Sequence, residues 1–244
     1  MVNKVNFGFK KINSKDKENL VGQIFSSVAP KYDIMNDFMS LGIHRYWKKM
    51  MIDQLEPNKR LIDVASGTGD IAKRYYKKCE NVDITLCDIN QDMLDVGKNR
   101  LLDENIFKGL KFVCCNGEKL PFDDFSFDYY TIAFGIRNFT NVKNALKEAY
   151  RVLEPGGKFV CLEFAKVTNP NMAKIYDCYS MNIIPKLGKL IVNDSESYQY
   201  LVESIRTFLS QEEFIQVMKD VGFQLCKYEN FNFGIAALYI GYKI

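Results

Sequence analysis

From about residue 60 onward, short apolar runs alternate with segments whose apolar residues recur at helical spacing. The runs are RLIDVAS (60–66), DITLCDI (83–89), LKFVCCNG (110–117), FDYYTIAFG (127–135) and GKFVCLEFA (157–165). Helical segments lie between them, clearest at 93–102 and 145–153. Repeated strand–helix–strand order predicts an α/β fold in which helices cover both faces of a parallel sheet.

The end of the chain departs from this order. A helix is predicted to open at Ser210 with the capping pattern SQEE and to end at Gly222. Two strands, QLCKYENF (224–231) and GIAALYIGYK (234–243), follow with too few residues between them for a parallel crossover. We therefore expect seven strands, mostly parallel, with an antiparallel last strand that forms an edge of the sheet near 238–242.

Two accessory pieces flank this repeat in a single structural domain. Residues 1–56 are predicted to form an N-terminal helical cap, and residues 57–244 the α/β domain, with a helical insertion at about 168–209. Ligands of such sheets bind in the crevice at the carboxyl ends of the strands. Both pieces are positioned to cover that crevice, so we expect them to build the pocket for a second substrate.

Composition narrows the class of protein. The net charge of +3 is small and the lysines are scattered among acids, which argues against nucleic acid as a partner. Seven cysteines without a CxxC pair indicate a reducing cytosol. No apolar run has the length of a signal peptide or a membrane span, so we expect a cytoplasmic protein whose membrane contact, on the inner face, is peripheral.

The segment from Tyr32 to Trp47, YDIMNDFMSLGIHRYW, mixes aromatic, polar and sulfur side chains too closely for an ordinary amphipathic helix. We interpret it as a substrate lid. His44 is the only histidine of the chain and is a candidate proton carrier. The alternative is that Trp47 anchors the segment to the domain and His44 is an ordinary hydrogen-bonded histidine.

The sequence DVASGTGD (63–70) ends the first strand of the repeat and opens a helix. Its glycines allow a tight turn and close approach of the backbone to a ligand. Gly67, Gly69 and Ala72 fit the GxGxxG/A pattern, and Asp88, 19 residues after Gly69, suits a ribose hydroxyl. This pattern alone allows either a nicotinamide cofactor or S-adenosylmethionine.

Three further features favour S-adenosylmethionine: the acid at Asp63, the pair Asn116–Gly117 that ends the third strand, and the closing hairpin. Together they resemble a Rossmann-like methyltransferase. The resemblance implies that Asp63 and the glycine turn hold the methionine part, Asp88 the ribose and Asn116 the adenine edge. The implied cofactor-binding residues are Asp63, Gly67, Thr68, Gly69, Asp88, Asn116, Gly117 and Ala133.

With the first segment included, residues 20–244 resemble the ubiquinone/menaquinone biosynthesis C-methyltransferase family. The pattern YDxMNxxxSxxxHxxW is matched from Tyr32 to Trp47, and FGIRN (134–138), RVL (151–153), PGG (155–157) and Glu163 match further signatures. The resemblance implies methylation of a ring carbon of a prenylated quinol, either a benzoquinol or demethylmenaquinol. The chain departs from the family at Ser66, Ala133, Glu154 and Ala165; Ala133 replaces a serine that commonly contributes to the cofactor site.

Methylation at carbon needs an electron-rich ring, and loss of the proton of a ring hydroxyl supplies it without a metal or a protein nucleophile. A phenol has a pKa of about 10, so the site must take up that proton or stabilise the oxyanion. Arg137, beside Asn138, is our main catalytic candidate for holding the oxyanion; the alternative is a structural salt bridge. His44, Asp33 and Tyr32 are candidates for accepting the proton.

The prenyl tail needs an apolar channel, and the insertion is rich in suitable side chains. The candidates are Tyr176, Tyr179, Met181, Ile183, Ile184 and Leu187, with Lys174, Lys186 and Lys189 meeting lipid headgroups. A second copy of the chain or a quinone-biosynthesis complex are further candidate partners. Competing functions are a non-catalytic subunit of such a complex, an NAD-linked quinone oxidoreductase and a methyltransferase of a small non-quinone acceptor.

Overall fold

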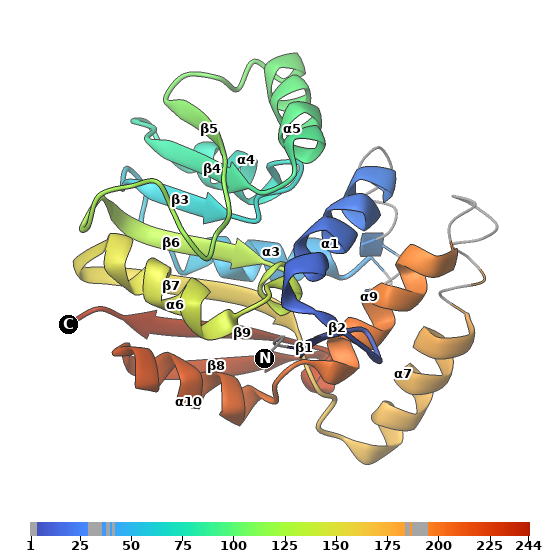
Figure 1. Cartoon of the computed structure of the whole chain (residues 1–244). Coiled ribbons are helices and arrows are strands. Elements are labelled where there is room, and N and C mark those ends of the chain that lie inside the picture. Colours follow the sequence, from blue (N-terminus) through green and yellow to red (C-terminus); the bar gives the residue numbers. More distant parts are fainter. Residues whose placement is uncertain (1–3, 29–35, 38–39, 41, 184–185, 187–194) are drawn as a thin grey trace.

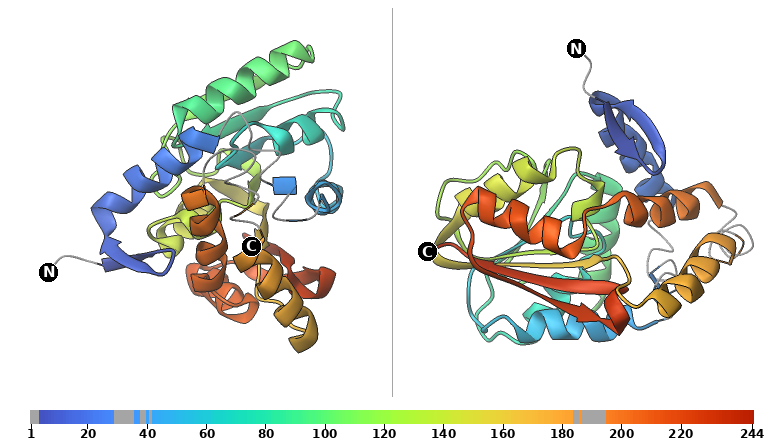
Figure 2. Two further views of the ribbon diagram at one scale, coloured as in Figure 1. Left: turned by 90° about the vertical axis from the view of Figure 1, so that its right-hand side faces the viewer. Right: turned by 90° about the horizontal axis from the view of Figure 1, so that it is seen from below.

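The computed structural model describes residues 4–28, 36–37, 40, 42–183, 186 and 195–244, which form a layered α/β molecule (Figures 1 and 2). Its helices are α1 (Ser14–Val28), α3 (His44–Asp53), α4 (Asp70–Tyr76), α5 (Gln91–Asp103), α6 (Val142–Val152), α7 (Pro170–Asn182), α9 (Ser195–Thr207) and α10 (Gln211–Val221), with 3-10 turns η2 (Ile136–Asn138) and η3 (Asn232–Gly234). Its strands are β1 (Lys4–Phe7), β2 (Lys10–Asn13), β3 (Leu61–Val64), β4 (Ile84–Asp88), β5 (Leu110–Cys114), β6 (Phe127–Ala133), β7 (Leu153–Phe164), β8 (Gln224–Phe231) and β9 (Ala236–Tyr242).

The central strands are apolar at nearly every position because helices cover both faces of the sheet. In β3, Leu61 packs in the core under α3, α4 and α5, whereas its neighbour Ile62 packs in the core under α6 and α10. In β7, Val160 packs in the same core as Leu61, and its neighbour Phe159 packs in the same core as Ile62. Figure 2 shows the two helical layers on opposite sides of the sheet.

The strand order in the main sheet is β5-β4-β3-β6-β7-β9-β8. All neighbouring pairs from β5 to β7 are parallel, while β9 is antiparallel to both β7 and β8. The predicted fold class, a seven-stranded Rossmann-like sheet with an antiparallel last strand, is therefore confirmed.

The expectation that the last strand forms an edge is wrong. Ile240 of β9 pairs with Val160 of β7 on one side and with Lys227 of β8 on the other. The side chains of β9 are buried along most of its length, whereas those of β8 are mostly exposed. The edge strand is therefore β8, the first strand of the hairpin, and β9 has no free edge for pairing with a second copy.

The sequence predicted a helical cap for the N-terminal residues, but the described part of this segment begins with the hairpin β1–β2. Gly8 makes its turn with a positive φ of 56°, a conformation that favours glycine. Helix α1 follows directly and lies beyond the carboxyl ends of the strands, beside α9 (Figure 1). Helix α7 packs on α9 in turn, so segments distant in sequence form one layer over that end of the sheet.

No helix in the described part of the chain has the length and apolar character needed to cross a bilayer. All seven cysteines are free thiols.

Helix α10 starts as the sequence predicts. The Ser210 side chain accepts a hydrogen bond from the Glu213 backbone N–H, and the Glu213 carboxylate accepts one from the Ser210 N–H. Ser210→Ala should therefore lower the free energy of unfolding by about 1 kcal/mol, because the Glu213 N–H loses its acceptor, the Ser210 hydroxyl. Ser210→Asn keeps an acceptor and should retain most of that stability; equal losses in urea unfolding would argue against the cap.

Candidate active site

A pocket of about 740 Å³ opens at the carboxyl ends of the parallel strands. Its walls are the residues that follow β3, β4, β5 and β6, which meet at this edge because the four strands run in one direction. Helix α1 covers it with Glu18, Val21 and Phe25. Helix α1, part of the predicted cap, thus lies over the crevice. The sequence alone did not indicate that Glu18 lines the pocket.

The glycine turn forms the floor of this pocket. Gly67 and Gly69 both have positive φ, at 53° and 76°, and Gly67 lines the pocket. Gly69 does not line it; a Cβ there would lie 3.1 Å from Leu101 and 3.2 Å from Leu86. Gly69 therefore serves the turn and its packing, and only Gly67 has its predicted position against the pocket.

Asp88 ends β4 and connects it to the glycine turn. Its Oδ2 accepts a hydrogen bond from the Gly67 N–H at 2.8 Å, and its Oδ1 accepts one from the Asn90 N–H at 2.9 Å. Burial raises the pKa of this carboxyl, and these backbone N–H groups oppose the rise. Each oxygen keeps capacity for a further bond, so Asp88 can accept from hydroxyl groups in the pocket.

Asn116 and Gly117 lie on the wall after β5, as the sequence predicts. Asn116 accepts from the Glu118 N–H at 2.8 Å and donates its amide to Glu18 at 3.0 Å. A Cβ at Gly117 would meet Phe139 at 2.8 Å and Val64 at 2.9 Å, so a larger residue there would force these side chains to shift. Glu18 and Asn116 together place an acceptor and an amide at one end of the pocket.

A second, smaller cavity of about 300 Å³ adjoins the pocket, with Ala65 lining both. Its polar walls include Lys48, Asp63, Ser66, Thr68 and Asp70, and the predicted Ala133 also lines it. The predicted cofactor residues therefore divide between two adjoining spaces, and Lys48 was missed because nothing in its sequence context sets it apart from the other lysines of the chain.

Two buried polar atoms in this cavity have no hydrogen-bond partner among the described residues: Oδ2 of Asp63 and Oγ of Ser66. The other oxygen of Asp63 accepts from the Thr131 hydroxyl at 2.8 Å. Burial raises the pKa of Asp63 to about 7, although Thr131 and the more distant Lys48 lower it. Unsatisfied buried polar atoms are costly, so the cavity is suited to a ligand that brings a donor.

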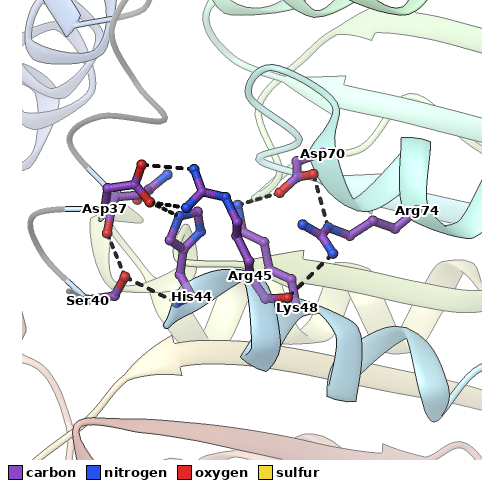
Figure 3. A network of polar contacts seen from close by, with 8 residues as sticks. Asp37, Ser40, His44, Arg45, Lys48, Asp70 and Arg74 are labelled. Carbon is purple, nitrogen blue, oxygen red and sulfur yellow. Dashed lines mark hydrogen bonds and ion pairs between the residues drawn. The ribbon is translucent and has the colours of Figure 1, made fainter. Parts of the chain in front are cut away.

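Figure 3 shows the polar network between α3 and the start of α4. The Lys48 ammonium lies 2.8 Å from Asp70, whose other oxygen binds Arg74 at 3.0 Å. Both cations hold the pKa of Asp70 well below its usual range despite its burial. This pairing fixes the first turn of α4, and with it the glycine turn.

His44 lies at the other end of the network in Figure 3. Its Nε2 is 2.9 Å from an oxygen of Asp37, and its backbone N–H donates to Ser40. Burial, together with the nearby Lys48, lowers the pKa of His44, so the ring is neutral at pH 7. Its Nδ1 is buried and has no partner in the part of the chain that the structure describes. His44 lines neither of the two cavities described above.

Trp47 anchors α3 to the sheet. It is 1% exposed, packs against Phe134 and Phe164, and donates its indole N–H to Asn232 at 2.8 Å. Tyr32 and Asp33, two of the predicted proton acceptors, lie outside the described residues.

Arg137 does not line the main pocket. Its guanidinium is buried and pairs with the fully buried Glu163 at 2.7 Å, while also donating to the Phe134 carbonyl and to Ser204. This is the structural salt bridge that the sequence left open as the alternative to catalysis. The pair fixes η2, and Glu163, noted only as a signature residue, had no predicted partner.

Asn138, the next residue, does line the pocket. Its Oδ1 accepts a hydrogen bond from the Tyr200 hydroxyl at 3.1 Å. Because that bond orients the amide, the NH₂ group is the part of Asn138 that is left to donate to a ligand. Of the predicted pair, Asn138 and not Arg137 therefore reaches the pocket.

The residues predicted to bind the prenyl tail lie in different surroundings. Tyr176 lines a cavity of about 800 Å³ between α7 and α9, whereas Met181 and Ile183 are exposed. Ile184, Leu187 and Lys189 lie outside the described residues. Among the residues that the structure describes, no group of three or more His, Cys, Asp or Glu side chains could hold a metal ion.

A parallel sheet closed by an antiparallel β9, a glycine turn after β3 and an acid at the end of β4 define a Rossmann-like methyltransferase fold. A methyltransferase from Aquifex aeolicus, described as SAM-dependent, matches with a TM-score of 0.64 at 14% identity, over 90% of this chain and 98% of its own. The [4+2]-cyclase SpnF matches with a TM-score of 0.68 at 16% identity, over 91% and 94%. Such distant likeness shows the fold alone.

The family follows from closer matches. The model of the ubiE/COQ5 methyltransferase family matches residues 11–243. The ubiquinone/menaquinone biosynthesis C-methyltransferases of Rickettsia bellii (strain OSU 85-389) and Rickettsia peacockii (strain Rustic) are each 51% identical to this chain, over 100% and 99% of both sequences respectively. The chain therefore belongs to the ubiE/COQ5 methyltransferase family and is a methyltransferase enzyme.

The buried ion pair gives a direct test of its structural role. Glu163→Ala leaves the Arg137 charge buried without its partner and should lower the free energy of unfolding by about 3–5 kcal/mol. Asp83→Ala, which removes the partner of the exposed Lys111, should cost less than about 1 kcal/mol. Urea unfolding of both variants measures the difference, and similar losses would contradict the role of the buried pair.

Proposed function

We propose that this protein transfers the methyl group of S-adenosylmethionine to a ring carbon of a prenylated quinol, a benzoquinol or demethylmenaquinol, in ubiquinone/menaquinone biosynthesis. The observation that carries the proposal is the two-part cavity at the carboxyl edge of the sheet, in a chain 51% identical along its length to enzymes named for this reaction. The fold alone does not carry it, since a cyclase shares that fold.

The residues fit S-adenosylmethionine. Asp88 would accept from ribose hydroxyls, and Glu18 with Asn116 would hold the adenine edge. In the smaller cavity, the unsatisfied Oδ2 of Asp63 would accept from the methionine ammonium, and Lys48, which also lines this cavity, would meet the carboxylate. When bound, the cofactor supplies an electrophilic methyl group on sulfur.

The acceptor binds against Asn138 and the apolar side chains Val21, Phe25 and Phe134 of the same pocket. Loss of the hydroxyl proton pushes electron density onto the neighbouring ring carbon, and the Asn138 amide donates to the oxyanion that forms. Arg137 acts as a positioning residue, because its ion pair with Glu163 holds the turn that carries Asn138. His44, Asp33 and Tyr32 stay the candidates for accepting the proton. The ring of His44 is neutral but lines neither cavity, so a water molecule would have to carry the proton to it.

The prenyl tail leaves the pocket toward α7 and α9, where Tyr176 lines the large cavity. Ile175, Met181 and Ile183 on and after α7 are exposed apolar side chains, which supports peripheral contact with the inner face of the cytoplasmic membrane. The protein works there alone, as a homodimer or in a quinone-biosynthesis complex.

Mass spectrometry of reaction products tests the proposed reaction. The enzyme and S-adenosylmethionine are incubated with a 2-polyprenyl-6-methoxy-1,4-benzoquinol or with demethylmenaquinol, with the oxidised quinones as controls. A gain of one methyl on a ring carbon, with the reduced acceptors only, is expected. Cofactor binding without methylation of either ring would overturn the acceptor and favour a small non-quinone substrate or a non-catalytic subunit.

Cofactor binding should release protons near pH 7. The pKa of Asp63 is about 7 in the free protein, and a bound ammonium favours its charged form, so on the order of half a proton leaves per site at pH 7. Calorimetry in two buffers of different ionisation enthalpy measures this release. Asp63→Asn should abolish it, and an equal release from that variant would refute the assignment.

Asn138 and Asp88 should differ in which step they affect. Asn138→Ala removes a donor to the oxyanion and should lower kcat by about 10²–10³ with little change in cofactor affinity. Asp88→Ala should instead weaken cofactor binding by about 10-fold or more. The exposed Asn144→Ala is the matched control and should change neither quantity. An Asn138→Ala enzyme with wild-type turnover would remove Asn138 from the mechanism.

A further inference from the structure

A groove of about 870 Å³ lies on the side of η2 away from the cofactor pocket, between the β1–β2 hairpin and α9. Phe139 and Thr140 line both spaces and separate them. We call this the basic groove, because its charged lining residues are Lys4, Lys11, Lys17 and Arg137, and no Asp or Glu is among the described residues that line it.

Lys17 is the most unusual of these cations. It is 6% exposed, and its ammonium donates to the Phe139 carbonyl at 2.8 Å. No carboxylate in the described part of the chain forms an ion pair with it; Glu118 acts on it only from a greater distance and accepts instead from the Thr140 N–H at 2.7 Å. Burial lowers the pKa of Lys17 to about 8, which reflects the missing counterion.

Arg137 does not supply a free charge to the groove, because Glu163 balances it. The two hairpin lysines do. Lys11 pairs across the hairpin with Asn6, and Lys4 precedes Asn6 by two residues, so the register puts Lys4 and Lys11 on one face. Lys10 lies on the opposite face and lines a different cavity. The net charge of the basic groove is therefore strongly positive.

The other walls of the groove suit a particular kind of anion. The hydroxyl residues Thr140, Ser204 and Thr207 line it, and so do the apolar side chains of Val5, Val142 and Phe208. Lysine ammonium groups with hydroxyls are typical of phosphate binding, and apolar walls beside them accommodate hydrocarbon. A quinol and its methyl donor carry no phosphate, so the proposed reaction does not use these cations.

We propose that the basic groove binds a phosphoryl group, presented either by an anionic phospholipid or by a soluble phosphate compound. Lys17 lies at the base of the groove and supplies a buried positive charge, while Lys4 and Lys11 close over the anion from the hairpin. This site is independent of the proposed methyl transfer, because it requires neither cofactor nor quinol.

Calorimetry on the full chain at constant ionic strength, without cofactor, tests the proposal. The probes are inorganic diphosphate, dihexanoylphosphatidylglycerol below its micelle concentration, and dihexanoylphosphatidylcholine as the zwitterionic comparison. Lys4→Gln/Lys11→Gln should weaken binding of the anionic probe by about tenfold, since two charges on the groove are lost. The matched control Lys10→Gln removes a neighbouring charge from the other hairpin face and should leave binding unchanged.

The probes also distinguish the source of the phosphoryl group. Binding of phosphatidylglycerol without diphosphate identifies a lipid headgroup, and binding of diphosphate shows that the phosphoryl group is sufficient. Failure of both anionic probes, or an equal loss in the Lys10 variant, would overturn the proposal. Lys4, Lys10 and Lys11 are exposed, so the Lys4→Gln/Lys11→Gln variant and the Lys10→Gln variant should keep wild-type thermal unfolding and cofactor affinity. Lys17→Gln is a third variant that should also weaken binding of the anionic probe.

Discussion

The hydrogen bond between the Gly67 N–H and the Asp88 carboxylate is the contact on which the site depends. It ties the turn after β3 to the end of β4, while the same carboxylate accepts from Asn90, the residue that caps α5. Helix α5 can pack on the turn because residue 97 is glycine: a Cβ there would lie 3.0 Å from the backbone of Thr68. The Asp88 carboxylate therefore holds the carboxyl ends of β3 and β4 and the start of α5 together, and these segments surround the cofactor pocket.

A second constraint holds the other side of the pocket. The Arg137–Glu163 pair is buried at the ends of β6 and β7, where breaking it would leave a charge in a medium of low dielectric constant. The pair fixes η2, so that Asn138 faces the pocket on one side while Lys17 binds the Phe139 carbonyl on the other. The same short turn thus separates the proposed methyl-transfer site from the basic groove.

The sequence predicted the main sheet well because its signals are local. Apolar runs mark strands that are buried on both faces, and Ser210 and Gly222 mark the ends of α10. The sequence did not predict which hairpin strand would be at the edge, because β9 lies between β7 and β8 through pairings with β7 that are distant in sequence. The short β1–β2 hairpin was missed because its four-residue strands carry little periodicity.

The candidate site was predictable where a residue lies at the end of a strand or within three residues of it, as Gly67, Asp88, Asn116 and Gly117 do. It was not predictable where a distant helix supplies the side chain, as α1 does with Glu18 and α3 with Lys48. Arginine at a strand end is compatible with catalysis or with an ion pair, and only the location of Glu163 distinguishes the two. A charge on the turn η2 that pairs with a charge on β7 leaves no pattern in a single sequence.

The most direct test of this account is a crystal structure of the protein with S-adenosylhomocysteine, which occupies the cofactor site without reacting. We expect the ribose hydroxyls at Asp88, the adenine edge between Glu18 and Asn116, and the amino group at the unsatisfied oxygen of Asp63. Density for the adenosine in another cavity, such as the one between α7 and α9, or a ribose turned away from Asp88, would contradict it.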